Sequence, residues 1–237
     1  IDVDADGIMK LAASDLDVTY DGQLQCRCVD AGAVTVDGKR LFDVVRSMPG
    51  EEVHFEVNHE NQVKISCMNT EFVLLGHSVD AYPPLPDSSN VALSSLDGFA
   101  LKELLERTML SISTDESRPN LNGVYLEFAD EDRIRMVSTD GHRLSRGEKS
   151  VEGSAQLPDK EGIIIPKKGV IELKKLLDDV GAEVSLGFID NNLVVRASNI
   201  NLYIRLIDAA FPDYQQVIPK SSERIVTLDR IPFLQSL

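Results

Sequence analysis

The sequence predicts an α+β fold made of tandem copies of one domain, and three observations lead to that prediction. Residues 53–74 are matched by residues 184–205 at a spacing of 131, and residues 9–15 by residues 134–140 at a spacing of 125. In both copies, segments with the two-residue alternation of β-strands surround a segment with helical spacing. Residues 226–237 start a third match. A repeat of about 130 residues is too long for a solenoid unit and suits a duplicated domain.

Alternating apolar residues predict strands in both copies, and turn residues separate them. Asp-Gly pairs such as Asp140-Gly141 favour tight hairpins between consecutive strands. The expected strands are 8–13, 23–28, 53–57, 63–67 and 72–75 in the first copy, and 125–128, 134–138, 163–165, 184–188, 193–196 and 202–206 in the second.

Three segments have helical spacing with an apolar stripe. The first and third occupy equivalent positions in the two copies. The second, near residues 96–112, precedes the strands of the second copy, and its counterpart would lie before Ile1. The stripes consist of Leu41, Val44, Val45 and Met48; of Leu101, Leu104, Leu105, Thr108 and Met109; and of Val170, Leu173, Leu176, Leu177 and Val180.

Two proline-containing linkers divide the chain into domains. Residues 82–89 have the composition of an extended linker, and residues 211–222 correspond to them. We therefore expect an N-terminally incomplete first domain at 1–87, a complete second domain at 90–220 and the truncated start of a third at 224–237. The absence of an initiating methionine fits the expectation that the chain is a fragment.

The composition is that of an ordinary globular protein, with 43% hydrophobic and 27% charged residues. No apolar run approaches the roughly 18 residues of a membrane-spanning helix. Asp2, Asp4 and Asp6 stand where a signal peptide would be basic. The three cysteines form no CxxC pair, which argues against a zinc site and for free thiols in a reducing cytosol.

The formal net charge of −15 would repel nucleic acid if it were spread evenly, but it is not. Residues 167–175 hold four lysines against one glutamate, and residues 38–48 hold three basic side chains against Asp43. Both segments lie on equivalent predicted helices, and Lys174 and Lys175 fall opposite the apolar stripe. An ordinary solvated helix face would explain one such segment. The recurrence in both copies favours a surface that meets phosphates.

The segment from Ser138 to Leu144 allows two interpretations. His142 could act as a base beside Ser138 or Asp140 in an enzyme. The favoured interpretation is a hairpin, because Asp140-Gly141 suits a tight turn between two strands. The sequence contains no Walker loop, no GxSxG, no HExxH and no GxGxxG after a strand, so no established catalytic motif supports an enzyme.

Three sequence motifs make the chain resemble the bacterial DNA sliding clamps, the beta subunits of the replicative DNA polymerase III. They are Thr-Asp-Gly-His-Arg-Leu at 139–144, Pro-Lys-Lys-Gly-Val-Ile-Glu-Leu at 166–173 and Phe-Pro-Asp-Tyr at 211–214. The resemblance covers essentially the whole chain. It implies that each domain has antiparallel sheets on the outside and two helices on the inner face.

The resemblance also implies a function. The full-length protein would be a cytoplasmic, nucleoid-associated head-to-tail homodimer that encircles double-stranded DNA and has no catalytic activity, metal or cofactor. Its partners would be the polymerase catalytic subunit, the clamp loader, repair polymerases and other proteins with a clamp-binding motif. The alternative is a β-rich peptide-docking scaffold that does not bind DNA.

Site residues are carried over at the positions that match the family. An apolar peptide pocket would use Leu121, Thr139, Gly141, His142, Arg143, Leu144, Pro212 and Val217. The DNA-facing residues would be Lys167, Lys168 and Lys175, with Lys174 beside them, and, by repeat equivalence, Lys39, Arg40 and Arg46. The dimer interface would use Phe72 and Leu74.

Overall fold

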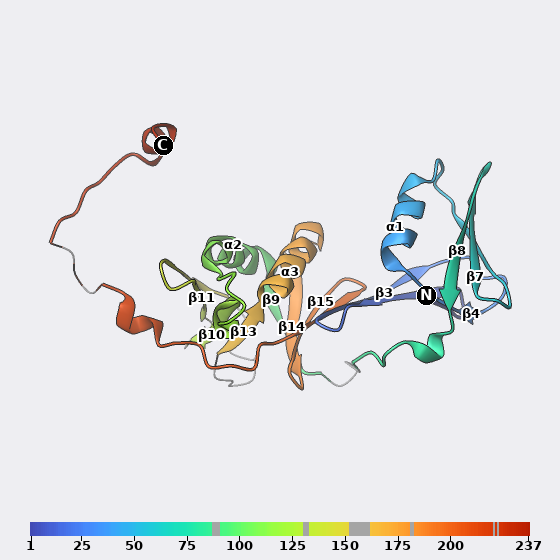
Figure 1. The fold of residues 1–237 in the computed structure, drawn as a ribbon, viewed down its shortest axis with the longest axis horizontal. Helices are drawn as coiled ribbons and strands as arrows, with labels where there is room; N and C mark the ends of the chain where they lie inside the picture. Colours follow the sequence, from blue (N-terminus) through green and yellow to red (C-terminus); the bar gives the residue numbers. More distant parts are fainter. Residues whose placement is uncertain (87–90, 130–132, 152–161, 181–182, 220, 222) are drawn as a thin grey trace.

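The computed structural model describes residues 1–86, 91–129, 133–151, 162–180, 183–219, 221 and 223–237. The predicted α+β class is confirmed. The recorded strand pairs of this part are antiparallel, and helices α1, α2 and α3 lie on the same side of the molecule (Figure 1). The expected domain limits at 87, 90 and 220 lie outside the described residues.

The first copy, which we call unit one, contains one helix and short strands. Its elements are β1 (Asp2–Val3), β2 (Ile8–Ser14), β3 (Val18–Gln25), β4 (Gly32–Ala33), β5 (Thr35–Val36), α1 (Gly38–Ser47), β6 (His54–Val57), β7 (Gln62–Cys67), β8 (Thr70–His77) and the 3-10 helix η1 (Val79–Ala81).

The second copy, unit two, has two helices, and its strands in the described part have four to seven residues. Its elements are β9 (Leu93–Asp97), α2 (Gly98–Thr108), η2 (Met109–Ser111), η3 (Pro119–Leu121), β10 (Gly123–Ala129), β11 (Arg133–Thr139), β12 (Leu144–Ser150), β13 (Ile163–Pro166), α3 (Lys167–Val180), β14 (Glu183–Ile189), β15 (Asn192–Ala197), β16 (Ile200–Arg205) and η5 (Tyr214–Val217). A short helix, α4 (Arg230–Gln235), follows and is exposed throughout.

The two units share one sheet. Its strand order is β4-β1-β2-β3-β16-β15-β14-β9, so β3 of unit one pairs with β16 of unit two. Val18 lies opposite Ile204 and Tyr20 opposite Leu202 in this pairing. The other two sheets have the orders β12-β11-β10-β13 and β5-β8-β7-β6. We call the β3–β16 pairing the seam.

The repeat is visible in the backbone as well as in the sequence. The hairpin β7–β8 turns at Met68 with φ of 50°, and the equivalent hairpin β15–β16 turns at Ser198 with φ of 52°. Helices α1 and α3 begin at equivalent positions after short strands. The two turns lie 130 residues apart, one fewer than in the sequence match. Side chains with left-handed φ are uncommon outside glycine, so their recurrence supports the duplicated topology.

Capping explains where two of the helices begin. The Asp37 carboxylate accepts a hydrogen bond from the Arg40 N–H at 2.8 Å, at the start of α1. The Asp97 carboxylate accepts from the N–H groups of Phe99 and Ala100 at the start of α2. Such caps satisfy N–H groups that lack a partner within the helix. The second helix is therefore shorter than the expected 96–112 and continues as the 3-10 turn η2.

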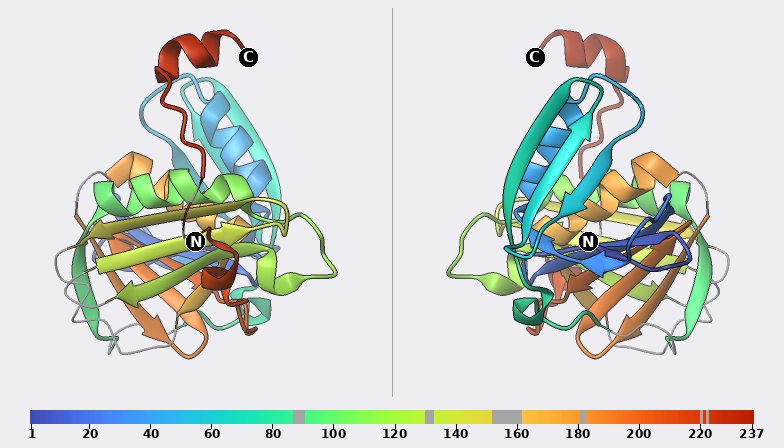
Figure 2. Two further views of the ribbon diagram at one scale, coloured as in Figure 1. Left: turned by 90° about the vertical axis from the view of Figure 1, so that its left-hand side faces the viewer. Right: turned by 90° about the vertical axis from the view of Figure 1, so that its right-hand side faces the viewer.

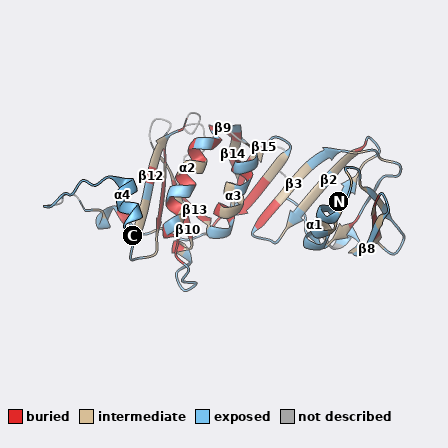
Figure 3. Ribbon diagram, turned by 90° about the horizontal axis from the view of Figure 1, so that it is seen from above, coloured by how far each residue is buried: buried red, intermediate tan, exposed pale blue. Residues whose placement is uncertain are grey.

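The main core lies in unit two, between α2, α3 and the strands of two sheets. Leu104, Leu105 and Leu173 have no exposed surface, and the third predicted apolar stripe is buried except for Val180, which is half-buried. Figure 2 shows α2 running along the edge of the β10–β12 strands, and Figure 3 shows α2 and α3 side by side.

The prediction for α1 is only partly right. Its stripe residues Leu41 and Val44 are half-buried, Val45 is 40% exposed, and no residue of α1 is fully buried. The buried core of unit one consists of Val34, Val63 and Ile65. In unit two, α2 packs beside α3, whereas α1 has no helix beside it in the described part. A single helix covers less of a sheet than two adjacent helices do, so the apolar stripe of α1 is less buried than that of α3.

One predicted strand is displaced. The expected strand 23–28 is observed as β3, which ends at Gln25, so Cys26 and Cys28 lie beyond it. Cys67 ends β7 and is buried, and the three cysteines are free thiols. The expectation that residues 224–237 begin a third unit stays a prediction. No helix in the described ranges is long and apolar enough to cross a membrane.

Candidate functional site

The turn between β11 and β12 is the predicted hairpin. Asp140 Oδ1 accepts hydrogen bonds from the N–H groups of His142 (2.9 Å) and Arg143 (3.0 Å), and Arg143 Nε donates to Asp140 Oδ2. These bonds lower the pKa of Asp140 to about 2. Thr139 Oγ1 accepts from the Gly141 N–H, and Gly141 has a φ of +90°. Glycine adopts this conformation without steric cost, so the backbone of the turn is held from within.

The hairpin does not form a catalytic pair. Ser138 is fully buried, and its hydroxyl donates to the backbone oxygen of Thr108. His142 is exposed, and the hydrogen bond recorded for it is the one from its own N–H to Asp140. A nucleophilic serine must be reachable and within hydrogen-bonding distance of its base. The geometry therefore contradicts a Ser138–His142 active site.

The linker after β16 is fixed to the outside of the β10–β11 strands by two aromatic residues. The Phe211 ring stacks on Tyr125 of β10, with ring centroids 4.6 Å apart and planes 1° from parallel. Phe211 also meets the Tyr214 ring edge-on at 6.4 Å. Stacked aromatic pairs contribute beyond the surface they bury. The linker is thereby held against the four-stranded sheet.

A charged network under Tyr214 completes this attachment. The Tyr214 hydroxyl donates to Glu127 Oε2 at 2.7 Å and lies 3.3 Å from Arg135 Nη1. Arg135 also binds Glu127 at 3.0 Å and Glu148 at 2.8 Å, which it faces across neighbouring strands. Burial, followed by the Glu127 carboxylate, raises the pKa of Tyr214. The network fixes where η5 begins.

The attached linker and strand β12 enclose a hollow of about 370 Å³. Five residues line it: Leu144, Arg146, Val217, Ile218 and Pro219. We call it the Leu144 hollow. Its walls are mainly apolar, with one guanidinium at the rim. Such a shallow apolar surface with few polar groups suits the side chains of a short peptide.

The structure brings together only part of the predicted pocket. Leu144 and Val217 line the hollow. Thr139, Gly141, His142 and Arg143 form the adjoining turn, and Pro212 lies in the linker that leads to η5. Leu121 is 6% exposed and belongs to the interior behind η3. It is not among the residues that line the hollow, and its role in peptide binding stays a prediction.

Sequence reasoning missed Arg146, Ile218 and Pro219 as lining residues, and Glu127, Arg135 and Tyr214 as the anchor. One signal was available for the anchor. Glu127, Arg135 and Glu148 lie on consecutive strands, and opposite charges on neighbouring strands can pair across a hairpin. The lining role of Pro219 had no such signal, because it depends on the path of the linker.

The predicted DNA-facing residues lie on helices that share one side of the molecule (Figure 1). Lys39, Arg40 and Arg46 belong to α1, and Lys167, Lys168, Lys174 and Lys175 belong to α3. Arg46 lies over the exposed Phe42 ring at 5.6 Å. Three basic side chains against Asp43 give α1 a formal charge of +2.

The basic surplus of α3 is largely compensated, which the sequence count did not predict. Lys174 pairs with Glu106 of α2 at 3.3 Å and with Asp178 at 2.9 Å. Lys175 pairs with Glu172, and Lys168 pairs with Asp15 on the β2–β3 turn of unit one. Among the described residues, Lys167 forms no ion pair. Glu172 and Asp178 are helical neighbours of the lysines, whereas Asp15 and Glu106 are distant in the sequence, so only tertiary packing reveals these two.

The predicted interface residues Phe72 and Leu74 lie on β8. Phe72 is 38% exposed, and Leu74 packs partly on the core of unit one. On the side away from β7, β5 pairs only with Gly76 and His77. In the described part, the edge of β8 from Thr70 to Leu75 is therefore open on that side.

Two family models match the chain. The model of the DNA polymerase III beta subunit N-terminal domain matches residues 1–86, and that of its central domain matches residues 95–213. The beta sliding clamp of Staphylococcus epidermidis is 31% identical over 203 residues, which is 86% of this chain and 53% of the relative. That of Staphylococcus aureus is 28% identical over 219 residues, which is 92% of this chain and 57% of the relative. The chain spans about half the length of these curated relatives.

Solved structures agree with these matches. The sliding clamp of Bartonella birtlesii bound to griselimycin has a TM-score of 0.81 at 34% identity, over 92% of this chain and 59% of that chain. Caulobacter crescentus pol III beta has a TM-score of 0.88 at 28% identity, over 99% of this chain and 64% of that chain. On this evidence the chain belongs to the DNA polymerase III beta subunit family, the beta sliding clamps.

Proposed function

We propose that the protein containing this chain is a DNA polymerase processivity factor: a head-to-tail homodimeric ring that encircles double-stranded DNA and tethers the replicative polymerase. The observation that carries the proposal is the seam, which joins two copies of one unit through a continuous sheet and leaves their helices on one side. Repeating the same junction curves the units around a common axis. The ring needs no catalytic group, and we propose none.

The internal repeat indicates how the ring would continue. Strand β16, which forms the seam with β3, is the repeat equivalent of β8, and β12 is the equivalent of β3. Strands β8 and β12 both have an open edge in the described part. A β8 edge could therefore pair with the strand of another subunit that corresponds to β3, with Phe72 and Leu74 at the contact. Exposed strand edges readily pair with a further strand.

The helix side would face the DNA. Lys39, Arg40 and Arg46 on α1 have no carboxylate partner in the described part and could attract phosphates without reading sequence. Lys168, Lys174 and Lys175 are held in ion pairs, which weakens their attraction for a phosphate. A weak, diffuse attraction lets a closed ring slide while its topology prevents dissociation. We propose that the protein is located in the cytoplasm, where it associates with the nucleoid.

The Leu144 hollow would dock the partners. We propose that short segments of the polymerase catalytic subunit, the clamp loader, repair polymerases and other clamp-binding proteins place apolar side chains on Leu144 and Val217. The hollow is lined by residues of β12 and of the linker after β16 and by none of α2 or α3, so a docked partner would not block the DNA path.

The test uses the full-length gene product loaded onto nicked circular duplex DNA. We expect it to stay on the circle during gel filtration and to be lost once the same DNA is linearised. Its mass in solution should be twice that of one chain. Equal retention on both forms of DNA would reject encirclement and favour the peptide-docking scaffold.

A further inference from the structure

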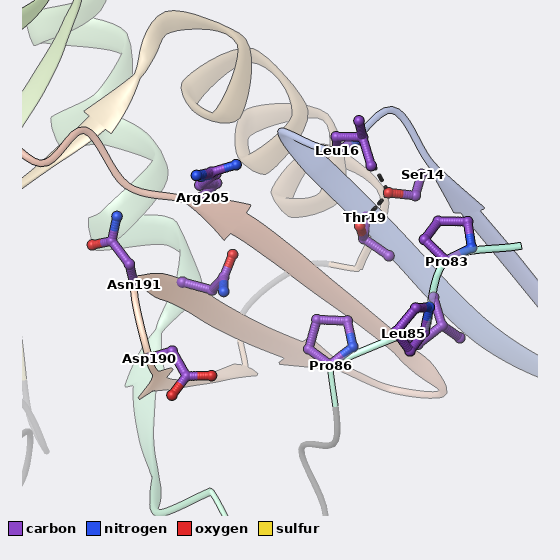
Figure 4. Close-up of a pocket in the computed structure, with 11 residues that line it drawn as sticks. Ser14, Leu16, Thr19, Pro83, Leu85, Pro86, Asp190, Asn191 and Arg205 are labelled. Carbon is purple, nitrogen blue, oxygen red and sulfur yellow. Dashed lines mark hydrogen bonds between the residues drawn. The ribbon is translucent and has the colours of Figure 1, made fainter.

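A second hollow, of about 330 Å³, lies where the two units meet (Figure 4). We call it the junction groove. Three segments form it: the β2–β3 turn of unit one, the linker after Tyr82, and unit two's β14–β15 turn with the end of β16. Its lining residues are Ser14, Leu16, Thr19, Pro83, Pro84, Leu85, Pro86, Asp190, Asn191, Asn192 and Arg205.

The turn of the junction groove repeats the turn beside the Leu144 hollow. Asp15 Oδ1 accepts from the N–H groups of Asp17 (3.2 Å) and Val18 (3.0 Å), as Asp140 Oδ1 does from the residues at the same spacing in unit two. Leu16 has a φ of 76° where Gly141 has 90°. The two turns therefore have similar backbone conformations, although unit one has a leucine where unit two has a glycine.

One lining position corresponds, and two more lining residues of the junction groove correspond to linker residues that do not line the Leu144 hollow. At the spacing of 125, Thr19 of the junction groove corresponds to Leu144 of the Leu144 hollow. At the spacing of 129, Pro83 corresponds to Pro212, and Leu85 corresponds to Tyr214, where η5 starts. Each unit therefore builds a groove from the same two parts, a hairpin turn and the linker that follows the unit.

The junction groove differs in having its far wall present. That wall comes from unit two, where the Arg205 N–H donates to the Asp17 oxygen at 2.9 Å and ties the end of β16 to the β2–β3 turn. Asn191 is fixed by a hydrogen bond from its side-chain amide to the Leu206 oxygen at 2.9 Å. The groove is thus held at a seam with continuous sheet pairing, so it exists before any ligand arrives.

The groove is apolar on one side and polar on the other, where Arg205 lies with Asp190, Asn191 and Asn192. Leu16 is 71% exposed and Leu85 40% exposed, and prolines extend the apolar side. Across the groove, Arg205 is exposed and forms no ion pair with the residues that the structure describes. An uncompensated guanidinium at the rim of an apolar groove favours a carboxylate, which it can bind in a bidentate manner.

We propose that the junction groove is a second peptide-docking site. It takes a short extended segment that lays an apolar side chain against Leu16 and Leu85 and presents a carboxylate to Arg205. The inference rests on the proposed peptide binding at the Leu144 hollow, because the repeat relates the two grooves. It adds a site with a different preference, because Arg146 at the Leu144 hollow is paired with Glu148 at 2.8 Å, whereas Arg205 has no ion pair in the described part.

The experiment measures binding of the peptides Ac-Leu-Leu-Glu-NH2 and Ac-Leu-Leu-Gln-NH2 to the whole chain by NMR titration of 15N-labelled protein. Leu144→Ala weakens peptide binding at the Leu144 hollow. The chemical-shift changes that the peptides still cause in this variant should map to residues around Leu16 and Arg205. In that background, Arg205→Glu should weaken binding of the glutamate peptide about tenfold, which corresponds to about 1.4 kcal/mol. It should leave the glutamine peptide much less affected.

A charge reversal gives the matched control. The Arg205→Glu variant should bind Ac-Leu-Leu-Lys-NH2 better than the unmodified chain does, because the pair is restored with opposite signs. Equal affinities for the glutamate and glutamine peptides, or shifts absent from the β2–β3 turn, would overturn the junction site. Peptide binding at this site with none at the Leu144 hollow would instead overturn the docking part of the proposed function and leave the junction site standing.

Discussion

Replacing Asp178 with asparagine tests whether ion pairing restrains the lysines of the helix side. Asp178 accepts from Lys174 at 2.9 Å and also pairs with Lys102 of α2, so it joins the two helices. These two ammonium groups lower the pKa of the Asp178 carboxyl, which is therefore ionised at neutral pH. Asp178→Asn removes the charge and keeps the shape, so it should release Lys102 and leave Lys174 with one ion pair in place of two. Exposed ion pairs contribute little to folding, so the fold should persist.

The expected magnitude follows from the number of charges. Helices α2 and α3 together carry six basic and five acidic side chains, a formal charge of +1, and the variant raises it to +2. Each lysine that contacts a phosphate steepens the slope of log K against log salt by about 0.9. Lys174 keeps its 3.3 Å pair with Glu106, whereas Lys102 loses its partner. We therefore expect the slope to steepen by about 1 to 2.

The assay is fluorescence anisotropy of a labelled duplex with the whole chain, between about 50 and 200 mM NaCl. Asp179→Asn is the matched control. Asp179 is the next residue on the same helix, it changes the net charge equally, and it forms no ion pair within the described residues. Its slope should stay near that of the unmodified chain. An unchanged slope for Asp178→Asn, or equal slopes for both variants, would refute local pairing as the restraint.

The other predictions concern the Leu144 hollow, the core and the hairpin turn. Leu144→Ala should weaken binding of an apolar peptide by about 1–3 kcal/mol, and calorimetry showing unchanged affinity would remove Leu144 from the docking surface. Tyr214→Phe should lower the free energy of unfolding by about 1.5–3 kcal/mol, because a hydroxyl bound to charged groups is lost. Urea denaturation measures this loss. The affinity for the peptide should fall as well, which calorimetry measures. Leu104→Ala should cost about 2.7–5 kcal/mol of unfolding free energy, because the side chain is fully buried and leaves a cavity, and a cost under about 1 kcal/mol in urea would mean that the core collapses around it. The pKa of Asp140 is depressed to about 2, so its contribution to stability is present above its unfolded-state pKa and is lost as the pH falls from about 4 to about 2. The difference in urea midpoint between the unmodified chain and Asp140→Asn should therefore be present at pH 6 and shrink at pH 2.5. A constant difference would contradict the prediction.

Local patterns in the sequence were sufficient for the elements of the fold. The alternation at 134–138 and 193–196 and the stripe of α3 each depend on neighbours within a few residues, because strand and helix periods are properties of the backbone. The hairpin at Asp140-Gly141 was predictable for the same reason. The displaced end of β3 and the poorly covered stripe of α1 show the limit, since both depend on what packs against them.

The sequence also determined the duplication, because two stretches with one spacing of apolar residues fold to one topology. Only the tertiary structure decided that β3 pairs with β16, since strand partners distant along the chain leave no local pattern. The same holds for charge. Four lysines in residues 167–175 predicted a basic face, whereas Asp15 and Glu106, distant in sequence, compensate two of them. Electrostatic attraction depends on distance in space, and folding sets that distance.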